Sequence, residues 1–227
     1  MTNDVLKQEA AARAAALVSD GMAVGLGTGS TAAFFIDCLI ARAKQGLKIV
    51  CIPTSERSGA QAKAGGLVLV DFSTHPVLDL TVDGADEISR AGLHLIKGLG
   101  GALLREKIVA SASKRLVIIA DDSKLVDVLG ARTAVPVEVT QFGWHATAVH
   151  LRATGAAIRQ RMAADGAPYV TDGGNFILDA KFDGITDPAA TAAQLKGITG
   201  VVETGLFIGL ASQALVATAT GVELLTP

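Results

Sequence analysis

The chain has 227 residues, of which 50% are hydrophobic, 19% are charged and only 4% are aromatic, and its formal net charge is −2. This length allows one large domain or a main domain with a small companion, and the composition can bury a substantial core. Scarce aromatic residues favour α/β layers packed from small aliphatic side chains. The net charge argues against nucleic acid as the main partner, because phosphate binding needs a basic face.

No segment has the pattern of a signal peptide or a membrane span. Residues 1–19 carry several charges and have no unbroken apolar core. Residues 206–225 are the most apolar stretch, but polar side chains interrupt it, whereas a span needs about 20 nearly uninterrupted apolar residues. We expect a buried strand and helix there. Cys38 and Cys51 lack a metal-type spacing, which indicates free thiols in a reducing cytoplasm.

Short apolar segments alternate with helical patterns over the first 120 residues. The expected strands are 22–26, 47–52, 67–70, 78–82 and 115–120, and the expected helices are 4–19, 32–44 and one that ends near residue 64. Thr2 or Asn3 is available to cap the first helix, and Gly46 is expected to end the second in a left-handed conformation. This alternation predicts an α/β fold whose parallel sheet has helices on both faces. Ligands bind at the carboxyl ends of such strands, so the loops after four of the strands should converge on one edge.

The pattern changes near Gly130. The segments that follow are an edge strand at 135–139, a helix at 144–154, a hairpin formed by 169–171 and 175–180, a helix at 187–196 and a strand at 201–207. The edge position is expected because Pro136 cannot donate to a ladder. Asp172-Gly173-Gly174 is a hairpin signal, and Asp187-Pro188 is typical of a helix start. We therefore expect a small α+β domain at 131–205, and a main domain formed by 1–130 and 206–227.

A glycine loop, Gly25-Leu26-Gly27-Thr28-Gly29-Ser30-Thr31, follows the first strand. Dinucleotide-binding folds place a glycine where this chain has Ser30. Backbone N–H groups and the hydroxyls of Ser30 and Thr31 instead suit a terminal phosphate monoester at a helix N-terminus. The alternative is an ordinary turn in which one of these hydroxyls caps the helix.

Three carboxylates, Asp83, Asp86 and Glu87, crowd the turn that follows the strand at 78–82. Burying them without partners would be costly, so they should bind a metal, bind sugar hydroxyls or cap the next element. Hydroxyl binding and proton relay are favoured over a metal, because the nearest histidine, His94, lacks ligand spacing. For Glu87, solvated capping is the alternative.

Lys97 precedes a loop containing Gly98, Gly100 and Gly101, and Glu106 follows early in the next helix. The glycines predict a flexible loop whose amides can approach a ligand closely. The lysine would lie near an anion or a developing oxyanion, and the helix dipole would stabilise the carboxylate of Glu106. For Arg105 and Lys107, which flank Glu106, the alternative to a site role is a solvated helix face, and this is the interpretation for Lys107. Lys124, in Asp121-Asp122-Ser123-Lys124, would contact substrate or pair with Asp121.

These motifs, together with Pro53-Thr54-Ser55-Glu56-Arg57-Ser58, the Thr171–Asn175 hairpin and the Gly200–Phe207 strand, occur in an order that resembles type A ribose-5-phosphate isomerases. The resemblance covers almost the whole chain. It implies interconversion of D-ribose 5-phosphate and D-ribulose 5-phosphate, without a metal or an organic cofactor. It also implies a Rossmann-like main domain, a small α+β (ferredoxin-like) domain, and assembly into homodimers or homotetramers that bind neither nucleic acid nor membrane.

By this resemblance the catalytic residues are Glu106, Asp83, Asp86 and Lys97. The substrate-binding residues are Thr28, Gly29, Ser30, Thr31, Asp83, Gly84, Ala85, Asp86, Lys97, Gly98, Leu99, Gly100 and Lys124. The sequence does not decide which aspartate moves protons between the sugar oxygens and which helps to open the ring. Rival functions are an amino-sugar phosphate isomerase, a CoA transferase or a sugar-phosphate sensor, and this chain has no basic helix-turn-helix segment for the last.

Overall fold

The computed structural model describes residues 2–227 and divides into two compact units. The first comprises Met1–Ala85, Arg105–Lys124 and Gly209–Pro227, and the second comprises Asp86–Leu104 and Leu125–Ile208. This division differs from the expected domain boundaries, because residues 86–104, 125–130 and 206–208 group with the second unit. The assignment of one unit as the catalytic domain remains a prediction.

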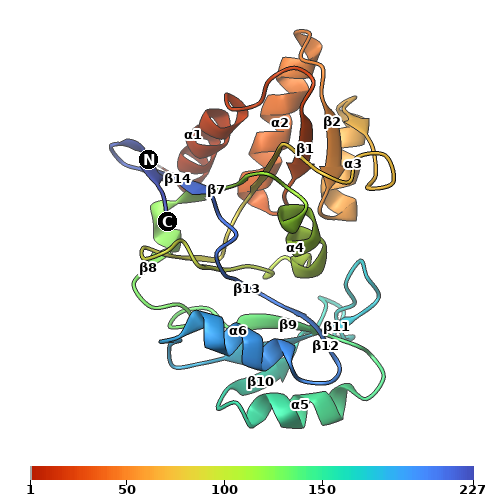
Figure 1. Ribbon diagram of the computed structural model, residues 1–227, viewed down its shortest axis with the longest axis vertical. Coiled ribbons are helices and arrows are strands. Elements are labelled where there is room, and N and C mark those ends of the chain that lie inside the picture. Colours follow the sequence, from red (N-terminus) through yellow and green to blue (C-terminus); the bar gives the residue numbers. More distant parts are fainter. Residues whose placement is uncertain (1) are drawn as a thin grey trace. The chain divides into compact units, whose positions relative to one another are not determined.

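The first unit is built on a seven-stranded sheet (Figure 1). Its strand order is β3 (Val68–Leu69), β2 (Val50–Pro53), β1 (Ala23–Leu26), β4 (Leu80–Asp83), β7 (Leu116–Asp121), β14 (Gln213–Thr218) and β15 (Gly221–Leu225). All neighbours are parallel except β14 and β15, which are antiparallel. The parallel sheet predicted from the sequence is therefore confirmed. The predicted helix within 206–225 is wrong, since β14 and β15 form an antiparallel hairpin there.

Helices cover both faces of this sheet, as predicted. The helices of one face are α1 (Asn3–Ala15), α2 (Ser30–Lys44) and α3 (Glu56–Ala64), which pack in one core with Val24, Leu26 and Val82. On the other face, Val109 of α4 (Leu103–Ser111) packs with Ala23, Ile52 and Leu78. The alternation of side chains along a strand assigns neighbouring residues of β1 to opposite cores.

The strand order 3-2-1-4 places a topological switch point between β1 and β4. In sheets of this type, the connections leave adjacent strands in opposite directions at the switch point, and this opens a crevice outside the carboxyl ends. The loop after β1 begins at Gly27, and the turn after β4 begins at Gly84. Two of the predicted site segments thus lie at the place where the fold itself favours a ligand.

The second unit contains a four-stranded antiparallel sheet with the order β10 (Ala157–Gln160), β11 (Phe176–Lys181), β9 (Val135–Val139) and β12 (Val201–Thr204). The helices α5 (Trp144–Arg152) and α6 (Pro188–Lys196) complete a β-α-β-β-α-β order along the chain. This order is the ferredoxin-like arrangement that the resemblance implies. The predicted start of α6 is confirmed, because the Asp187 side chain accepts a hydrogen bond from the Ala190 N–H (2.9 Å).

The predicted edge position of residues 135–139 is wrong, since β9 lies between β11 and β12. The Pro136 carbonyl accepts a hydrogen bond from the Gly205 N–H (2.7 Å). In an antiparallel strand, the N and O of one residue face the same neighbour, so the missing Pro136 N–H faces Gly205. That position lies just beyond the last β9–β12 pair, Val137–Thr204, and the proline therefore removes no bond from the ladder.

The expected strand at 201–207 is divided at Gly205 into β12 and β13 (Leu206–Phe207), which belong to different sheets. The strand β13 joins a third sheet with β6 (Leu95–Ile96), β5 (Glu87–Ser89) and β8 (Leu125–Val126). A Cβ at position 205 would lie 2.3 Å from the Lys97 carbonyl oxygen, so only glycine permits this crossing. Sequence patterns missed this sheet because its strands have only two or three residues.

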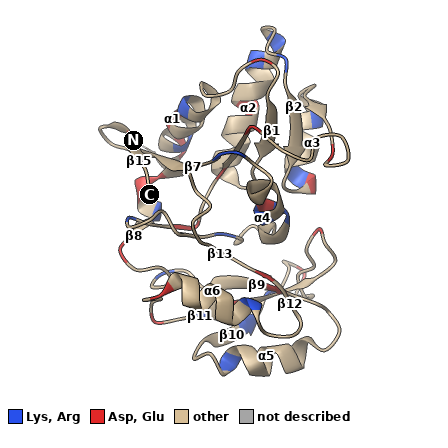
Figure 2. Cartoon of the chain, in the orientation of Figure 1, with Lys and Arg blue, Asp and Glu red and all other residues tan. Residues whose placement is uncertain are grey.

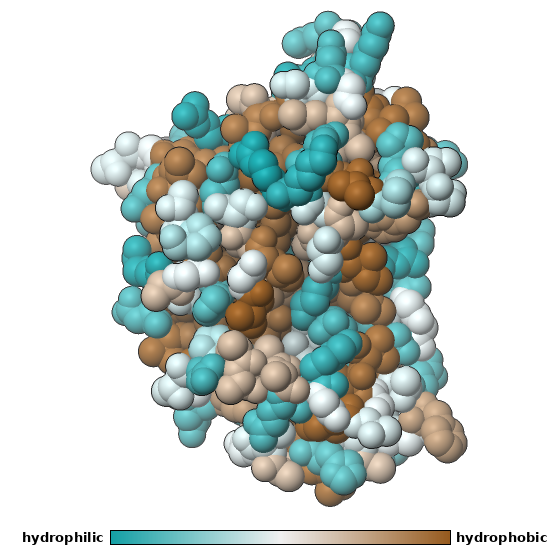
Figure 3. All heavy atoms as spheres, viewed as in Figure 1, coloured by the Kyte–Doolittle hydropathy of each residue, from teal (hydrophilic) through white to brown (hydrophobic). Residues whose placement is uncertain are grey.

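Charged residues are distributed over both units (Figure 2), and hydrophobic and hydrophilic residues are interspersed on the face shown in Figure 3. The most exposed large apolar side chain among residues 2–227 is Phe142, at 94%. No helix in that range is both long enough and apolar enough to cross a membrane.

Candidate active site

The predicted site residues are divided between the two units. The first unit carries Thr28–Thr31, Asp83–Ala85, Glu106 and Lys124, and the second carries Asp86 and Lys97–Gly100. The chain connects the two groups covalently, because Ala85 precedes Asp86 and Leu104 precedes Arg105.

In the first unit, Asp83 fastens the loop after β1 to the end of β4. Its side chain is 1% exposed, and Oδ1 accepts hydrogen bonds from the N–H groups of Thr28 (3.0 Å) and Gly84 (2.7 Å). Gly27 makes this approach possible, since a Cβ there would lie 2.5 Å from the Cα of Asp83. One oxygen of this buried carboxylate therefore sets the conformation of the glycine loop.

Four buried hydroxyls hold the same loop from the side of β2. Thr28 Oγ1 donates to Ser55 Oγ (2.7 Å), Ser55 Oγ donates to Ser58 Oγ (3.0 Å), and Ser58 Oγ donates to the Gly27 carbonyl (2.7 Å). Thr54 Oγ1 lies 2.7 Å from Thr28 Oγ1 and donates to the Leu26 carbonyl (3.0 Å). We call Thr28, Thr54, Ser55 and Ser58 the hydroxyl cluster. It links the carboxyl ends of β1 and β2 without using a charge.

Sequence reasoning noted the segment that carries three of these hydroxyls but assigned them no site role. Ser55 is the N-cap of α3, and its Oγ accepts a hydrogen bond from the Ser58 N–H (3.1 Å). The signal for this cap was a serine directly before the first residue of a helix. The further bonds to Thr28 could not be read from the sequence, because they join segments more than 25 residues apart.

The helix α2 begins at Ser30, and its N-cap residue, Gly29, has a φ of 115°. No side chain caps this helix end, so the interpretation of Ser30 or Thr31 as a simple cap is wrong. Ser30 is exposed and Thr31 is half-buried. The first-turn N–H groups of a helix have no partner within the helix and carry a partial positive charge. This helix end can therefore bind an anion.

Glu106 lies in the first turn of α4, as predicted, and is 4% exposed. The neighbouring Arg105 donates through Nη1 to Oε1 of Glu56 on α3 (2.7 Å), so the alternative of a merely solvated side chain does not hold for Arg105. At the end of β7, the buried Asp121 accepts a hydrogen bond from the Ser123 N–H (3.1 Å). Lys124 is half-buried at the end of the short 3-10 helix η1 (Asp122–Lys124).

In the second unit, Asp86 and Lys97 are held by backbone contacts at the ends of β5 and β6. The Asp86 N–H donates to the Ile96 carbonyl (2.8 Å), and the Lys97 N–H donates to the Gly205 carbonyl (2.9 Å). Lys97 is 2% exposed, and its Nζ lies 5.5 Å from the centre of the Phe207 ring. This distance is within the range of a cation–π contact, which holds the buried ammonium group against the aromatic ring.

The segment Gly98–Gly101 is fixed by several contacts, although its glycines predicted flexibility. Asp86 Oδ2 accepts from the Leu99 N–H (2.9 Å), and the Gly98 carbonyl accepts from the Gly101 N–H (3.0 Å). The Leu99 side chain is 51% exposed, whereas its backbone is bonded. Gly98 and Gly101 have φ values of 105° and 82°, a conformation that a side chain disfavours.

Sequence reasoning also missed Arg161, which binds this loop. Its Nη1 donates to the carbonyls of Gly98 (2.8 Å) and Leu99 (3.0 Å), while Asp179 accepts from its Nε (3.0 Å) and Nη2. No local signal in the sequence connects Arg161 to a loop more than 60 residues earlier.

Glu87 is buried rather than solvated. Its carboxylate is 1% exposed and accepts hydrogen bonds from the N–H groups of Gly130 (2.7 Å), Arg132 (3.2 Å) and Thr133 (2.6 Å). These contacts hold the segment that leads into β9. The role of Glu87 is thus structural, and the alternative of a solvated cap is wrong.

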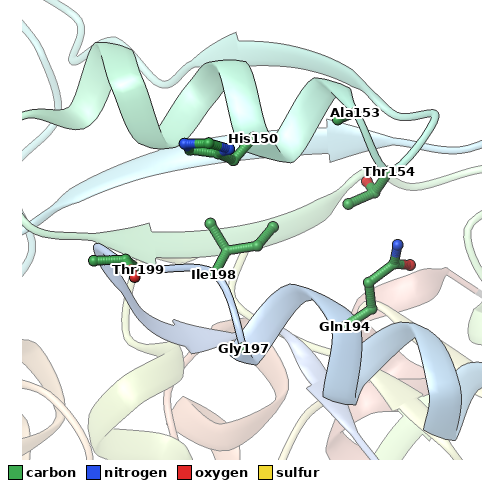
Figure 4. Close-up of a pocket in the computed structure, with 7 residues that line it drawn as sticks. All are labelled: His150, Ala153, Thr154, Gln194, Gly197, Ile198 and Thr199. Atoms are coloured by element: carbon green, nitrogen blue, oxygen red, sulfur yellow. The ribbon is translucent and has the colours of Figure 1, made fainter.

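A pocket of about 350 Å³ lies elsewhere in the second unit, between α5 and the end of α6 (Figure 4). Its lining residues are His150, Ala153, Thr154, Gln194, Gly197, Ile198 and Thr199. This lining includes one titratable side chain, His150, and neither a carboxylate nor a lysine, and it contains none of the predicted site residues. Among residues 2–227, no group of three or more His, Cys, Asp or Glu side chains is arranged to hold a metal ion.

Comparisons with known proteins place the chain in a family. Residues 50–221 match the family model of ribose 5-phosphate isomerase A (phosphoriboisomerase A). A ribose-5-phosphate isomerase A from Gloeobacter violaceus is 55% identical over 227 residues, which cover 100% of this chain and 98% of the relative.

Solved structures agree with this match. Ribose 5-phosphate isomerase A from Methanocaldococcus jannaschii is 37% identical with a TM-score of 0.96, and all of both chains is covered. A D-ribose-5-phosphate isomerase in complex with phospho-erythronic acid is 38% identical with a TM-score of 0.97, again over all of both chains. The chain belongs to the ribose 5-phosphate isomerase A family.

Proposed function

We propose that this chain is an aldose–ketose isomerase that interconverts D-ribose 5-phosphate and D-ribulose 5-phosphate. The observation that carries the proposal is the 55% identity, over the entire chain, to a relative named ribose-5-phosphate isomerase A. The reaction moves a carbonyl from C1 to C2 of the open-chain sugar. It requires removal of the C2 proton, a cis-enediol intermediate, and delivery of a proton to C1.

Glu106 is the proposed general base and acid. A single carboxylate on one face of the enediol can accept the C2 proton and return it to C1, so that one group serves both half-reactions. Its position in the first turn of α4 and its burial at 4% exposure support this role. Water is kept from the carboxylate, and the helix N-terminus stabilises its charged form.

Lys97 and the N–H groups of the following loop are the proposed electrophiles. Negative charge develops on the carbonyl oxygen as the C2 proton leaves, and preorganised donors in a dry site stabilise this charge strongly. The burial of Lys97 and the fixed backbone of residues 98–101 support this assignment.

Asp83 and Asp86 are the proposed acids that face the sugar oxygens, and Gly84 and Ala85 complete the turn between them. Proton exchange between O1 and O2, and opening of the furanose ring, both need a carboxyl group near these oxygens. Each aspartate uses one oxygen to hold a loop, namely Oδ1 of Asp83 and Oδ2 of Asp86. Kinetics of ring opening, measured separately from isomerisation in variants of each aspartate, would show which residue performs which task.

The phosphate group is proposed to bind at residues 28–31, with Lys124 as a further cation. The N-terminus of α2, the exposed hydroxyl of Ser30 and the half-buried Thr31 support this assignment. Binding energy from the phosphate orients the sugar without entering the chemistry.

We also propose a cytoplasmic homodimer or homotetramer that acts without a metal or an organic cofactor. Light scattering of the purified chain tests its assembly. A coupled assay of ribulose 5-phosphate formation, run with and without a chelator, tests both the reaction and its metal independence. Isomerase activity that is equal in the two assays is the expected result. No formation of ribulose 5-phosphate would overturn the proposed function.

Glu106→Gln tests the assignment of the base. It should lower kcat by at least about a thousandfold, because the amide cannot accept the C2 proton. Binding of phospho-erythronic acid, measured by calorimetry, should stay within about threefold. Glu223→Gln, on the exposed strand β15, is the matched control and should be fully active. A Glu106→Gln variant with ordinary turnover would assign the base to another residue.

A further inference from the structure

Arg161 joins the ferredoxin-like sheet of the second unit to the loop that carries Lys97. Its guanidinium Nη1 donates to two successive carbonyls, those of Gly98 (2.8 Å) and Leu99 (3.0 Å). On its other side, Nε and Nη2 form a two-point contact with the carboxylate of Asp179 on β11. The side chains of Arg161 and Asp179 are 13% and 24% exposed. Partly buried ion pairs joined by two hydrogen bonds have a defined geometry, unlike most surface pairs.

The backbone of Arg161 is itself fixed. Its N–H donates to the Ile177 carbonyl (2.9 Å), and its carbonyl accepts from the Tyr169 N–H (2.9 Å). Tyr169 returns to the loop, since its hydroxyl donates to the Gly100 carbonyl (3.4 Å). Backbone hydrogen bonds therefore fix the start of the Arg161 side chain, and Asp179 fixes its guanidinium group.

These contacts set the orientation of two peptide planes. In a trans peptide, the carbonyl and the following N–H point in opposite directions. The Gly98 carbonyl points to Arg161, and the N–H of Leu99 in the same plane points to Asp86 Oδ2 (2.9 Å). In the next plane, the Leu99 carbonyl also points to Arg161, so the Gly100 N–H faces away from the guanidinium.

We propose that Arg161, held by Asp179, is a positioning residue for the isomerase reaction. It turns the carbonyls of Gly98 and Leu99 away from the substrate, and this presents the Gly100 N–H and the adjacent Lys97 to the developing oxyanion. Without it, either carbonyl oxygen can rotate toward the enediolate and repel the charge. This role rests on the proposed function, because it assigns the loop a partner in that reaction.

The alternative is that the Arg161–Asp179 pair only stabilises the fold. Arginine is specific to the positioning role, since one planar guanidinium can bind two carbonyls and a carboxylate at once, whereas a lysine ammonium is a compact point charge. Arg161→Lys keeps the charge and should still lose the orientation of the loop. Arg161→Met removes both.

Steady-state kinetics of the full-length chain test the proposal. Arg161→Met and Arg161→Lys should each lower kcat by about tenfold to a hundredfold, with KM changed by less than about threefold, because misplaced donors weaken transition-state stabilisation rather than ground-state binding. Asp179→Asn should lower kcat less, by about threefold to tenfold. The matched control is Arg152→Met, since Arg152 is an exposed residue of the same unit at the end of α5, and this variant should keep the kcat of the unmutated chain.

A second readout does not depend on activity. Hydrogen–deuterium exchange of the Leu99 and Gly101 amides, followed by NMR, should accelerate at least about tenfold in Arg161→Lys, while the amides of β11 keep their protection. Unchanged exchange, or a kcat within twofold of the unmutated chain in both Arg161 variants, would overturn the proposal. If Arg161→Met does not fold, Arg161→Lys and Asp179→Asn decide the question. If the unmutated chain lacks isomerase activity, that result refutes the proposed function instead. The exchange experiment then still tests whether Arg161 and Asp179 hold the loop.

Discussion

Two loops of the candidate active site are held in place by different chemistry. The loop at Gly27–Thr28 is held by the neutral hydroxyl cluster and by one carboxylate oxygen of Asp83. The loop at Gly98–Leu99 is held by a guanidinium on one side and a carboxylate on the other. Both loops are rich in glycine and looked alike in the sequence.

The difference follows from what hydroxyls and guanidinium groups can do. A hydroxyl both donates and accepts and can rotate its O–H bond, so a cluster of hydroxyls tolerates small shifts of its neighbours. A guanidinium only donates, and its N–H groups lie in a rigid plane, so it dictates where carbonyls point. An adjustable support suits the loop proposed to anchor a phosphate, and a rigid support suits the loop proposed to stabilise a transition state.

The largest expected effect is on the free energy of unfolding, because two backbone segments approach each other closely next to each loop. A Cβ at position 27 would lie 2.5 Å from the Asp83 Cα, and one at position 205 would lie 2.3 Å from the Lys97 carbonyl. Gly27→Ala and Gly205→Ala should each lower the free energy of unfolding by about 3 kcal/mol, measured by urea denaturation, because backbone atoms cannot yield.

Gly84→Ala is the control for these two variants. The nearest atoms to a Cβ there are 3.9 Å away, so its free energy of unfolding should change by no more than about 0.5 kcal/mol. If Gly27→Ala or Gly205→Ala is as stable as Gly84→Ala, the backbones beneath that loop do not approach as closely as described.

The next prediction separates the two supports by their kinetics. Ser58→Ala removes the donor to the Gly27 carbonyl, and it should raise KM for the sugar phosphate by about threefold to tenfold while kcat changes less than twofold. It should also lower the free energy of unfolding by about 1–2 kcal/mol, because buried polar groups lose a partner. Ser111→Ala, at the exposed end of α4, is the control. A loss of kcat with unchanged KM would show that the two loops are not functionally distinct.

The sequence indicated the first loop better than the second. The strands and helices of the main sheet repeat a strong apolar pattern, and their carboxyl ends meet at one edge by topology alone. Thr28, Asp83 and Glu106 could thus be placed near strand ends or a helix start. The sheet formed by β13, β6, β5 and β8 has strands too short for any periodicity, and Pro136 was misjudged because a central strand can hold a proline at the end of a ladder. Arg161 gave no local signal, since the loop that it contacts lies more than 60 residues earlier in the chain.

A smaller effect concerns pH. At the start of β1, the Ala23 N–H donates to the Asp79 carboxylate (2.9 Å), so the stability of this strand should depend on pH. The hydrogen bond from the Lys114 ammonium, and then that from Ala23, lower the pKa of Asp79 below its ordinary value. A lowered pKa contributes stability that is fully present above the unfolded-state value of about 3.9 and is lost as the pH falls through the folded-state pKa.

Asp79→Asn tests this contribution by thermal unfolding. At pH 7 the variant should be less stable by up to about 1 kcal/mol, because the pair is partly exposed. Near pH 2.5 the difference should shrink, since the unmutated carboxyl is then losing its charge as well. An equal difference at both pH values would mean that the charge of Asp79 does not stabilise β1.

The smallest expected effect concerns the rate at which Cys51 reacts with a thiol reagent, which reports local opening near the hydroxyl cluster. Burial raises the pKa of Cys51 to about 12, and this thiol, in β2 just before the hydroxyl cluster, is 0% exposed. At pH 8 a maleimide should modify the half-buried Cys38 first and reach Cys51 only through local opening.

If the hydroxyl cluster holds β1 and β2 together, Ser58→Ala should accelerate modification of Cys51 by about fivefold for each kcal/mol of local stability lost. Arg161→Lys should leave that rate unchanged, because its contacts belong to the second unit. Equal acceleration in both variants would mean that the two loops open together, and the contrast between a neutral and a charged support would then have no consequence for the dynamics of the site.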